Sequence, residues 1–120
     1  MEIRRAMPVI RTDEPAEARR FYEGFLGFRV AMDEDGMLML VSRSTPTTQV
    51  IVAWPSATAV DPELLSVDVS IEVADVEAAY AAARSQALEM VRGLRDEPWG
   101  VRRFFVRDPS GHTINVASHL

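Results

Sequence analysis

The 120-residue sequence predicts an α+β fold in which two βαβββ modules form a curved, bowl-like mixed sheet with the helices on the outside. One observation behind this prediction is an order of one strand, one helix and three strands that occurs twice. Another is a spacing of matching positions, since Ile10 lies 61 residues before Ile71. A later match places Val52 63 residues before Asn115. A module of this size cannot bury its sheet face and helix alone, so the two copies are expected to pack around a shared cleft.

We expect one domain over residues 1–120, with module one at about residues 4–55 and module two at about residues 66–120. A linker over about residues 56–65 is predicted from its Pro, Ser, Thr and Asp content.

The first module opens with a strand predicted over residues 6–11. Thr12 or Asp13 can cap the following helix, and Gly27 is expected to end it. Within this helix, apolar residues recur at helical spacing and predict one buried face: Ala18, Phe21, Tyr22, Phe25 and Leu26. Three strands are then predicted, at residues 28–32, 37–42 and 49–54, with a turn at residues 33–36 between the first two.

The second module opens with a strand over residues 66–73, in which apolar side chains alternate with Asp68, Ser70 and Glu72. Asp75 can cap the next helix. The buried stripe of that helix is predicted to hold Val76, Ala79, Tyr80, Ala83 and Ala87. Residues 89–91 are predicted as a short strand and residues 94–100 as a loop.

The last third of the chain predicts an antiparallel hairpin over residues 101–116, because Asp-Pro-Ser-Gly at residues 108–111 is typical of a tight turn. If these four residues form the loop, Arg107 faces His112 and Phe104 lies beside Asn115. Arg102 then shares a mixed polar face with Phe104, which suits the wall of a ligand site.

Two stretches resemble one known family. They are FFVRDPSGHTIN at residues 104–115, preceded by EPWG at residues 97–100, and FYEGFLGF at residues 21–28. In this order they are similar to the glyoxalase/bleomycin-resistance/dioxygenase superfamily, also called the vicinal oxygen chelate superfamily. The EPWG stretch is closest to the metal-free binding proteins of the bleomycin-resistance type.

The resemblance also implies where a metal would be bound in metal-dependent members of the family. The corresponding positions here are Met7, Val52, Asp68 and Asn115. Only Asp68 is ionisable, whereas a catalytic metal needs about three protein ligands. We therefore expect no metal and no cofactor. A shifted site would have to use Glu72, His112 or His119.

A ligand site can nevertheless be predicted. Trp54, Trp99, Met7 and Phe104 would supply an apolar surface for a planar molecule. For Trp54, a place in the core is equally compatible with the sequence. The polar groups that orient the ligand would be Asp68, Glu72, Arg102 and Asn115.

The first functional hypothesis is a binding protein for a small aromatic or cationic molecule, with a role in antibiotic resistance. The alternative is a divalent-metal-dependent lyase or isomerase, or a ring-cleaving dioxygenase, of the same superfamily. A third hypothesis is metal-free catalysis, in which Asp68 or Glu72 is the general base. No catalytic residue is assigned beyond these two candidates.

Composition limits the partners. The formal net charge of −5 argues against a nucleic-acid surface, and no apolar run is long enough to cross a membrane. The absence of cysteine excludes disulfides and sulfur-ligated zinc. No signal-peptide pattern follows Met1, so a cytoplasmic protein is expected. Because a chain this short commonly completes its core by pairing, we expect a homodimer.

Overall fold

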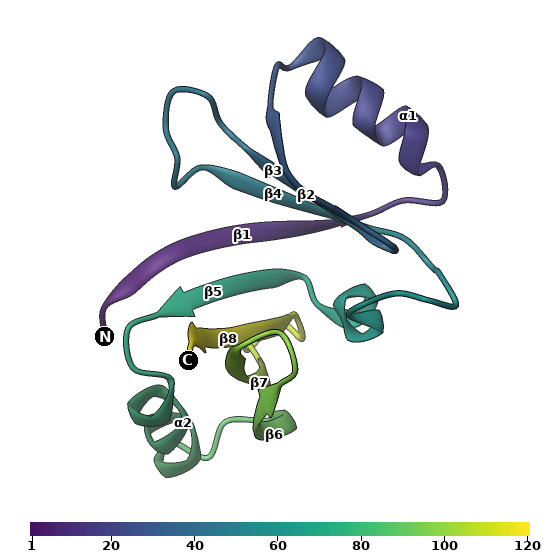
Figure 1. Cartoon of the computed structure of the whole chain (residues 1–120). Coiled ribbons are helices and arrows are strands. Elements are labelled where there is room, and N and C mark those ends of the chain that lie inside the picture. Colours follow the sequence, from purple (N-terminus) through teal and green to yellow (C-terminus); the bar gives the residue numbers. More distant parts are fainter. The chain divides into compact units, whose positions relative to one another are not determined.

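The computed structural model describes all residues 1–120 and divides them into two compact units. The N-terminal unit comprises Met7–Ser66, and the C-terminal unit comprises Met1–Ala6 together with Val67–Leu120. The first strand, β1 (Ile3–Arg11), therefore contributes its first residues to the C-terminal unit and its remaining residues to the N-terminal unit. Figure 1 shows the elements of each unit in chain order.

In the N-terminal unit, β1 is followed by α1 (Pro15–Arg19), the π-helical turn η1 (Arg20–Phe25), β2 (Arg29–Glu34), β3 (Met37–Val41), β4 (Gln49–Ala53) and the short 3-10 helix η2 (Pro62–Ser66). The strand order is β2-β3-β4-β1, in which β4 is parallel to β1 and the other pairs are antiparallel.

The C-terminal unit contains β5 (Val69–Val73), α2 (Val76–Ser85), β6 (Met90–Glu97), β7 (Val101–Arg107) and β8 (Thr113–His119). Their order is β5-β8-β7-β6, with β5 parallel to β8, so the second unit repeats the arrangement of the first. The first residues of β1 lie next to β5. The predicted α+β class and the repeated βαβββ order are confirmed.

Helix α2 covers one face of the C-terminal sheet (Figure 1). Asp75 caps it as predicted, because its carboxylate accepts a hydrogen bond of 3.0 Å from the Ala78 N–H. Its buried residues pack with Phe104 and Val116, and Tyr80 lies edge-on to Phe104 with ring centroids 5.1 Å apart. Ala87 is an exception to the predicted stripe, since it lies beyond the helix and is exposed.

The helix of the N-terminal unit differs from its prediction. Ala18 and Tyr22 pack against Leu38, Leu40 and Val52 as expected for a buried face. The remaining members of that predicted face are exposed: Phe21, Phe25 and Leu26. The reason is that the helix changes to π-helical geometry after Arg19, with the Leu26 N–H donating to the Phe21 carbonyl, and each wider turn rotates the later side chains away from the core.

The predicted cap of this helix is also wrong. Neither Thr12 nor Asp13 caps it, because the helix begins after Glu14 and has no side-chain capping bond. The Thr12 hydroxyl instead accepts a hydrogen bond from the Glu14 N–H at 3.0 Å. At the other end, Gly27 follows the last turn with a left-handed φ of 78°, as predicted.

The closing hairpin forms where predicted, but its register differs by one residue. The Gly111 N–H donates to the Asp108 carbonyl at 3.0 Å, and the Asp108 N–H donates to the His112 carbonyl at 2.9 Å. Gly111, with a φ of 88°, is therefore an extra residue on one side of the hairpin. As a result, Phe104 pairs with Val116, and Phe105 pairs with Asn115.

This shift changes which side chains share a face, because a slip of one residue exchanges the two faces of a strand. Phe104 lies on the helix-covered face, not on a ligand-facing wall. Arg102 is on that side too, where its guanidinium contacts Glu77 of α2 and, at 2.6 Å, Asp96. The prediction for both residues is corrected accordingly.

Strand β6 is longer than predicted. The loop expected over residues 94–100 is extended as far as Glu97, and only the last residues form a turn. Its charged residues had indicated a loop, yet on the strand Arg95 pairs with Arg103 of β7 and Glu97 pairs with Val101.

The new register can be tested through stability. Phe104 is 1% exposed, so Phe104→Ala should lower the free energy of unfolding by about 3–5 kcal/mol. Phe25→Ala is the matched control, because Phe25 is 75% exposed and its loss should change stability by no more than about 0.5 kcal/mol. Urea denaturation followed by circular dichroism measures both values. Equal losses in the two variants would contradict the assignment of Phe104 to the core.

Candidate functional site

The sheet of the C-terminal unit has a second face, opposite α2, which is here called the polar face. Its side chains are those that alternate with the helix-packed ones: Asp68, Ser70, Glu72, Arg92, Glu97, Arg103, Phe105, Thr113 and Asn115. The alternation predicted for β5 is confirmed by its register with β8. Most of these polar residues are buried, which requires that they bind one another or a ligand.

A carboxylate surrounded by arginines lies at the β6 end of the polar face. Glu97 accepts hydrogen bonds from Arg92 at 2.6 Å and from Arg95 at 3.1 Å, and the Arg103 Nε lies 3.5 Å from the same oxygen. Burial alone raises the pKa of Glu97. The hydrogen bonds from Arg95 and Arg92 and the charge of Arg103 together outweigh it, so the pKa lies below its ordinary value.

Aromatic rings adjoin these arginines. The guanidinium of Arg92 lies 4.6 Å from the ring centroid of Phe105, and that of Arg103 lies 5.0 Å from it. Arg103 also lies 5.0 Å from the ring of Trp99, which is in the turn between β6 and β7. Phe105 is 2% exposed whereas Trp99 is 39% exposed, so Trp99 offers a ring surface on the edge of this layer.

The middle of the polar face is formed by β5 and β8. The Asp68 carboxylate accepts a hydrogen bond of 2.9 Å from the Thr113 N–H. The Asn115 Nδ2 donates to the Ser70 hydroxyl at 2.9 Å, while the Asn115 Oδ1 is buried and has no hydrogen-bond partner. A buried carbonyl oxygen without a donor is costly, so this atom marks a place where a ligand N–H would be stabilising.

Glu72 closes the other end. Its carboxylate accepts hydrogen bonds from Arg5, at 3.0 Å from Nε and 2.5 Å from Nη2, and lies 3.3 Å from the His119 Nε2. The carboxylate is thus held by a cation of β1 within the C-terminal unit. This engagement does not favour Glu72 as a general base, which has to be available to a substrate proton.

The predicted site residues therefore separate. Asp68 and Asn115 share the polar face, and Trp99 lies at its edge. In the N-terminal unit, Met7 is buried on β1. Trp54 packs against the Leu38, Leu40 and Val52 cluster, which settles its open alternative in favour of the core.

Sequence reasoning missed the residues that form the arginine and aromatic layer, namely Arg92, Glu97, Arg103 and Phe105. The signal that could have found the last two is Gly111, since a glycine at this point of a hairpin is typical of a bulge that shifts the register. The loop assigned to residues 94–100 concealed Glu97.

A family comparison agrees with this architecture. The profile of the Glyoxalase/Bleomycin resistance protein/Dioxygenase superfamily matches residues 4–116. The chain belongs to this superfamily. No curated protein matches the chain. The structure contains no helix with the length and apolar character that a membrane crossing requires.

Solved structures show the same superfamily fold. A superfamily member from Vibrio splendidus 12B01 has a TM-score of 0.73 at 19% identity, with 97% of this chain and 98% of that chain covered. A hypothetical protein from Bacillus halodurans C-125 has a TM-score of 0.78 at 13% identity, covering 100% and 96%. The methylmalonyl-CoA epimerase from Mycobacterium tuberculosis has a TM-score of 0.72 at 18% identity, covering 99% and 88%.

The residues do not fit the metal site found in metal-dependent members of the superfamily. Val52 lies in the helix-facing core of its unit, and it is Ile51 that pairs with Val9, as Asn115 pairs with Ser70 in the other unit. The repeat spacing at this strand is therefore 64 residues and not 63. Ile51 is no metal ligand either, and no group of three His, Asp or Glu side chains is close enough to hold an ion.

The arginine cluster predicts a pH-dependent contribution to stability. Because the pKa of Glu97 is lowered in the folded state, its contribution is present above the ordinary value of 4.5 and is lost as the pH falls through the folded pKa. Glu97→Gln should cost about 3 kcal/mol at pH 7, since three arginines lose a buried partner. The difference from wild type should shrink below pH 4.5.

Urea unfolding at a series of pH values measures this difference. Glu77→Gln is the control, because it removes an exposed partner of Arg102 and should have little effect. A cost for Glu97→Gln that stays constant down to acid pH would show that ionisation of Glu97 does not contribute.

Proposed function

We propose that this superfamily member binds a small aromatic or cationic molecule on the polar face of its C-terminal unit, without a metal ion. The observation that carries the proposal is the combination of the exposed ring of Trp99 with the buried, unpartnered Oδ1 of Asn115. A planar ring can stack on the indole, and an N–H group of the same molecule can donate to Asn115.

The surrounding charges support an oriented ligand. Arg103 fixes the inner side of Trp99, so the indole is held in place before a ligand arrives and loses little freedom on binding. Asp68 supplies a negative charge on the same face as Asn115 and would attract a cationic nitrogen. The hydrogen bond from Thr113 fixes the orientation of that carboxylate.

The binding hypothesis predicts distinct roles for two side chains. We use bleomycin and the planar cation proflavine as probes. Trp99→Ala should weaken binding by about 1–3 kcal/mol, since it removes the stacking surface. Asp68→Asn should weaken proflavine selectively relative to a neutral planar probe, because the amide retains the hydrogen bond from Thr113 but lacks the charge.

Titration calorimetry measures these affinities. Trp54→Phe is the control, because Trp54 packs in the core of the other unit and its replacement should leave the affinity unchanged. Equal affinity of wild type and Trp99→Ala for every probe would mean that Trp99 is structural.

The alternative of a metal-dependent lyase, isomerase or dioxygenase has one supporting observation, the structural similarity to a methylmalonyl-CoA epimerase. Metal analysis of the purified protein distinguishes the two functions. A stoichiometric divalent ion that is lost on Asp68→Ala would favour the enzyme over the binding protein.

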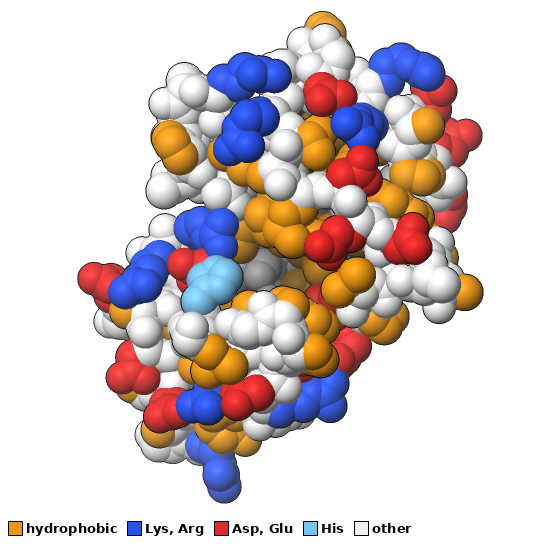
Figure 2. Space-filling model, in the orientation of Figure 1, with side chains coloured by type: hydrophobic (Ala, Val, Ile, Leu, Met, Phe, Trp, Pro, Cys, Tyr) orange, Lys and Arg blue, Asp and Glu red, His pale blue; other side chains and the backbone are white.

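We further propose that the protein is a cytoplasmic homodimer in which Phe21, Phe25 and Leu26 make the contact. These three side chains are 50%, 75% and 51% exposed, and the rings of Phe21 and Phe25 lie 5.5 Å apart. Hydrophobic side chains reach the surface among charged ones in this region (Figure 2, upper right). Exposed apolar groups of this kind are typical of protein interfaces.

The charges beside this patch support a second copy as the partner. Glu17 and Arg20 form an exposed ion pair, and Arg19 pairs with Glu23. A helix with both signs along one side is complementary to an antiparallel copy of itself, as a twofold axis requires.

Light scattering tests the assembly. Wild type should have twice the mass of the 13.4 kDa chain at micromolar concentration, and Phe25→Asp should shift it toward a single chain because it buries a charge in the contact. Val60→Asp, at an exposed valine outside the helix, should stay dimeric. A monomeric wild type would exclude the dimer, and a dimeric Phe25→Asp would exclude this patch as its interface.

A further inference from the structure

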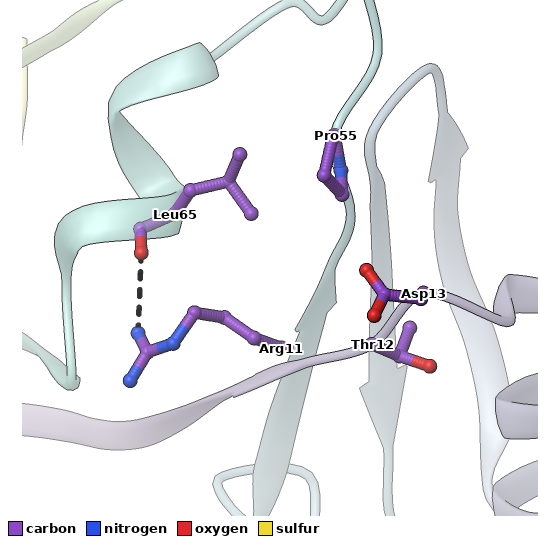
Figure 3. A pocket seen from close by; sticks show the side chains of 5 residues that line it. All are labelled: Arg11, Thr12, Asp13, Pro55 and Leu65. Carbon is purple, nitrogen blue, oxygen red and sulfur yellow. Dashed lines mark hydrogen bonds between the residues drawn. The ribbon is translucent and has the colours of Figure 1, made fainter.

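The N-terminal unit contains a concavity that is independent of the polar face. It is lined by Arg11, Thr12, Asp13, Pro55 and Leu65 (Figure 3). Its position follows from the sheet, because the parallel strands β1 and β4 end side by side at Arg11 and Ala53. The chain then departs in two directions, into α1 and into the linker, and leaves a space beyond the strand ends. Space at the carboxyl ends of neighbouring parallel strands is a common place for ligands in open sheets.

The walls of this pocket have opposite charges at two sides. The carboxylate of Asp13 points into the pocket beside Pro55, whereas Arg11 and Leu65 lie across from it (Figure 3). Asp13 is exposed and makes no hydrogen bond or ion pair. One amino group of Arg11 donates to the Leu65 carbonyl at 3.3 Å, which orients the guanidinium along the pocket wall. A guanidinium carries five N–H donors, so this bond leaves it able to contact a carboxylate as well.

Size and apolar surface narrow the ligand further. The pocket volume is about 250 Å³, and since water occupies about 30 Å³ per molecule, there is room for about eight groups of water size. Pro55 and Leu65 offer apolar contact between the two charged walls. The Thr12 hydroxyl is already engaged by the Glu14 N–H and is not needed for recognition.

We propose that this pocket binds a small zwitterion with a short apolar body, of the α-amino acid class, whose ammonium group pairs with Asp13 and whose carboxylate contacts Arg11. The proposal does not depend on the ligand site of the C-terminal unit. Either site can therefore be occupied, or fail, without the other.

Two-dimensional proton–nitrogen NMR spectra of the whole chain test the proposal with three probes. L-Valine carries both charges, isobutylamine lacks the carboxylate and 3-methylbutanoate lacks the ammonium group. L-Valine should shift the amide signals of Thr12, Asp13 and Leu65 at lower concentration than either of the other two probes. Asp13→Asn should weaken L-valine by at least about fivefold and leave 3-methylbutanoate unchanged, because it removes only the partner of the ammonium group.

Glu14→Gln is the matched control, since it removes the same charge from the neighbouring residue outside the pocket and should leave every titration unchanged. Unshifted pocket amides with all three probes, or equal L-valine affinity in wild type and Asp13→Asn, would overturn the proposal. Shifts confined to Trp99 and Phe105 would place L-valine on the polar face and would also overturn it.

Discussion

The side-chain arrangement of the C-terminal unit depends on the register of one hairpin. Gly111 adopts a left-handed conformation that other residues rarely adopt, and the Asp108 carboxylate accepts hydrogen bonds from the N–H groups of Ser110 and His112, both at 2.9 Å. The bond from the His112 N–H is the main reason that the pKa of Asp108 is lowered. These bonds fix the bulge, and the bulge directs Phe105 and Arg103 to the polar face and Phe104 to the core.

The sequence was sufficient for the fold but not for the details of the site. Hydrophobic periodicity and capping predicted the alternation of β5, the cap Asp75 and the order of elements in both modules, because these depend on neighbouring residues. The contents of the polar face depend on pairing between strands, where one inserted residue exchanges both faces. The exposed Phe25 was missed for a related reason, since the change to π-helical geometry follows from hydrogen bonds that a regular helical spacing does not predict.

The two modules share their topology but have different chemistry on equivalent strands. Val9 and Ile51 of the N-terminal unit correspond to Ser70 and Asn115 of the C-terminal unit. All four are buried, yet only the second pair carries polar atoms that need partners. A repeated backbone has therefore been combined with an apolar surface in one copy and with a hydrogen-bonding surface in the other.

The division of β1 between the two units limits how the protein can be taken apart. A fragment that starts after the linker would keep all of β5 to β8 but would lose Arg5, and Glu72, whose side chain is only 14% exposed, would be left without its guanidinium partner. The edge of β5 would also lose its neighbouring strand and present unpaired backbone groups to other chains. Although the modules look like products of a duplication, the second half is not a self-sufficient folding fragment, and its first six residues must be supplied from the opposite end of the chain.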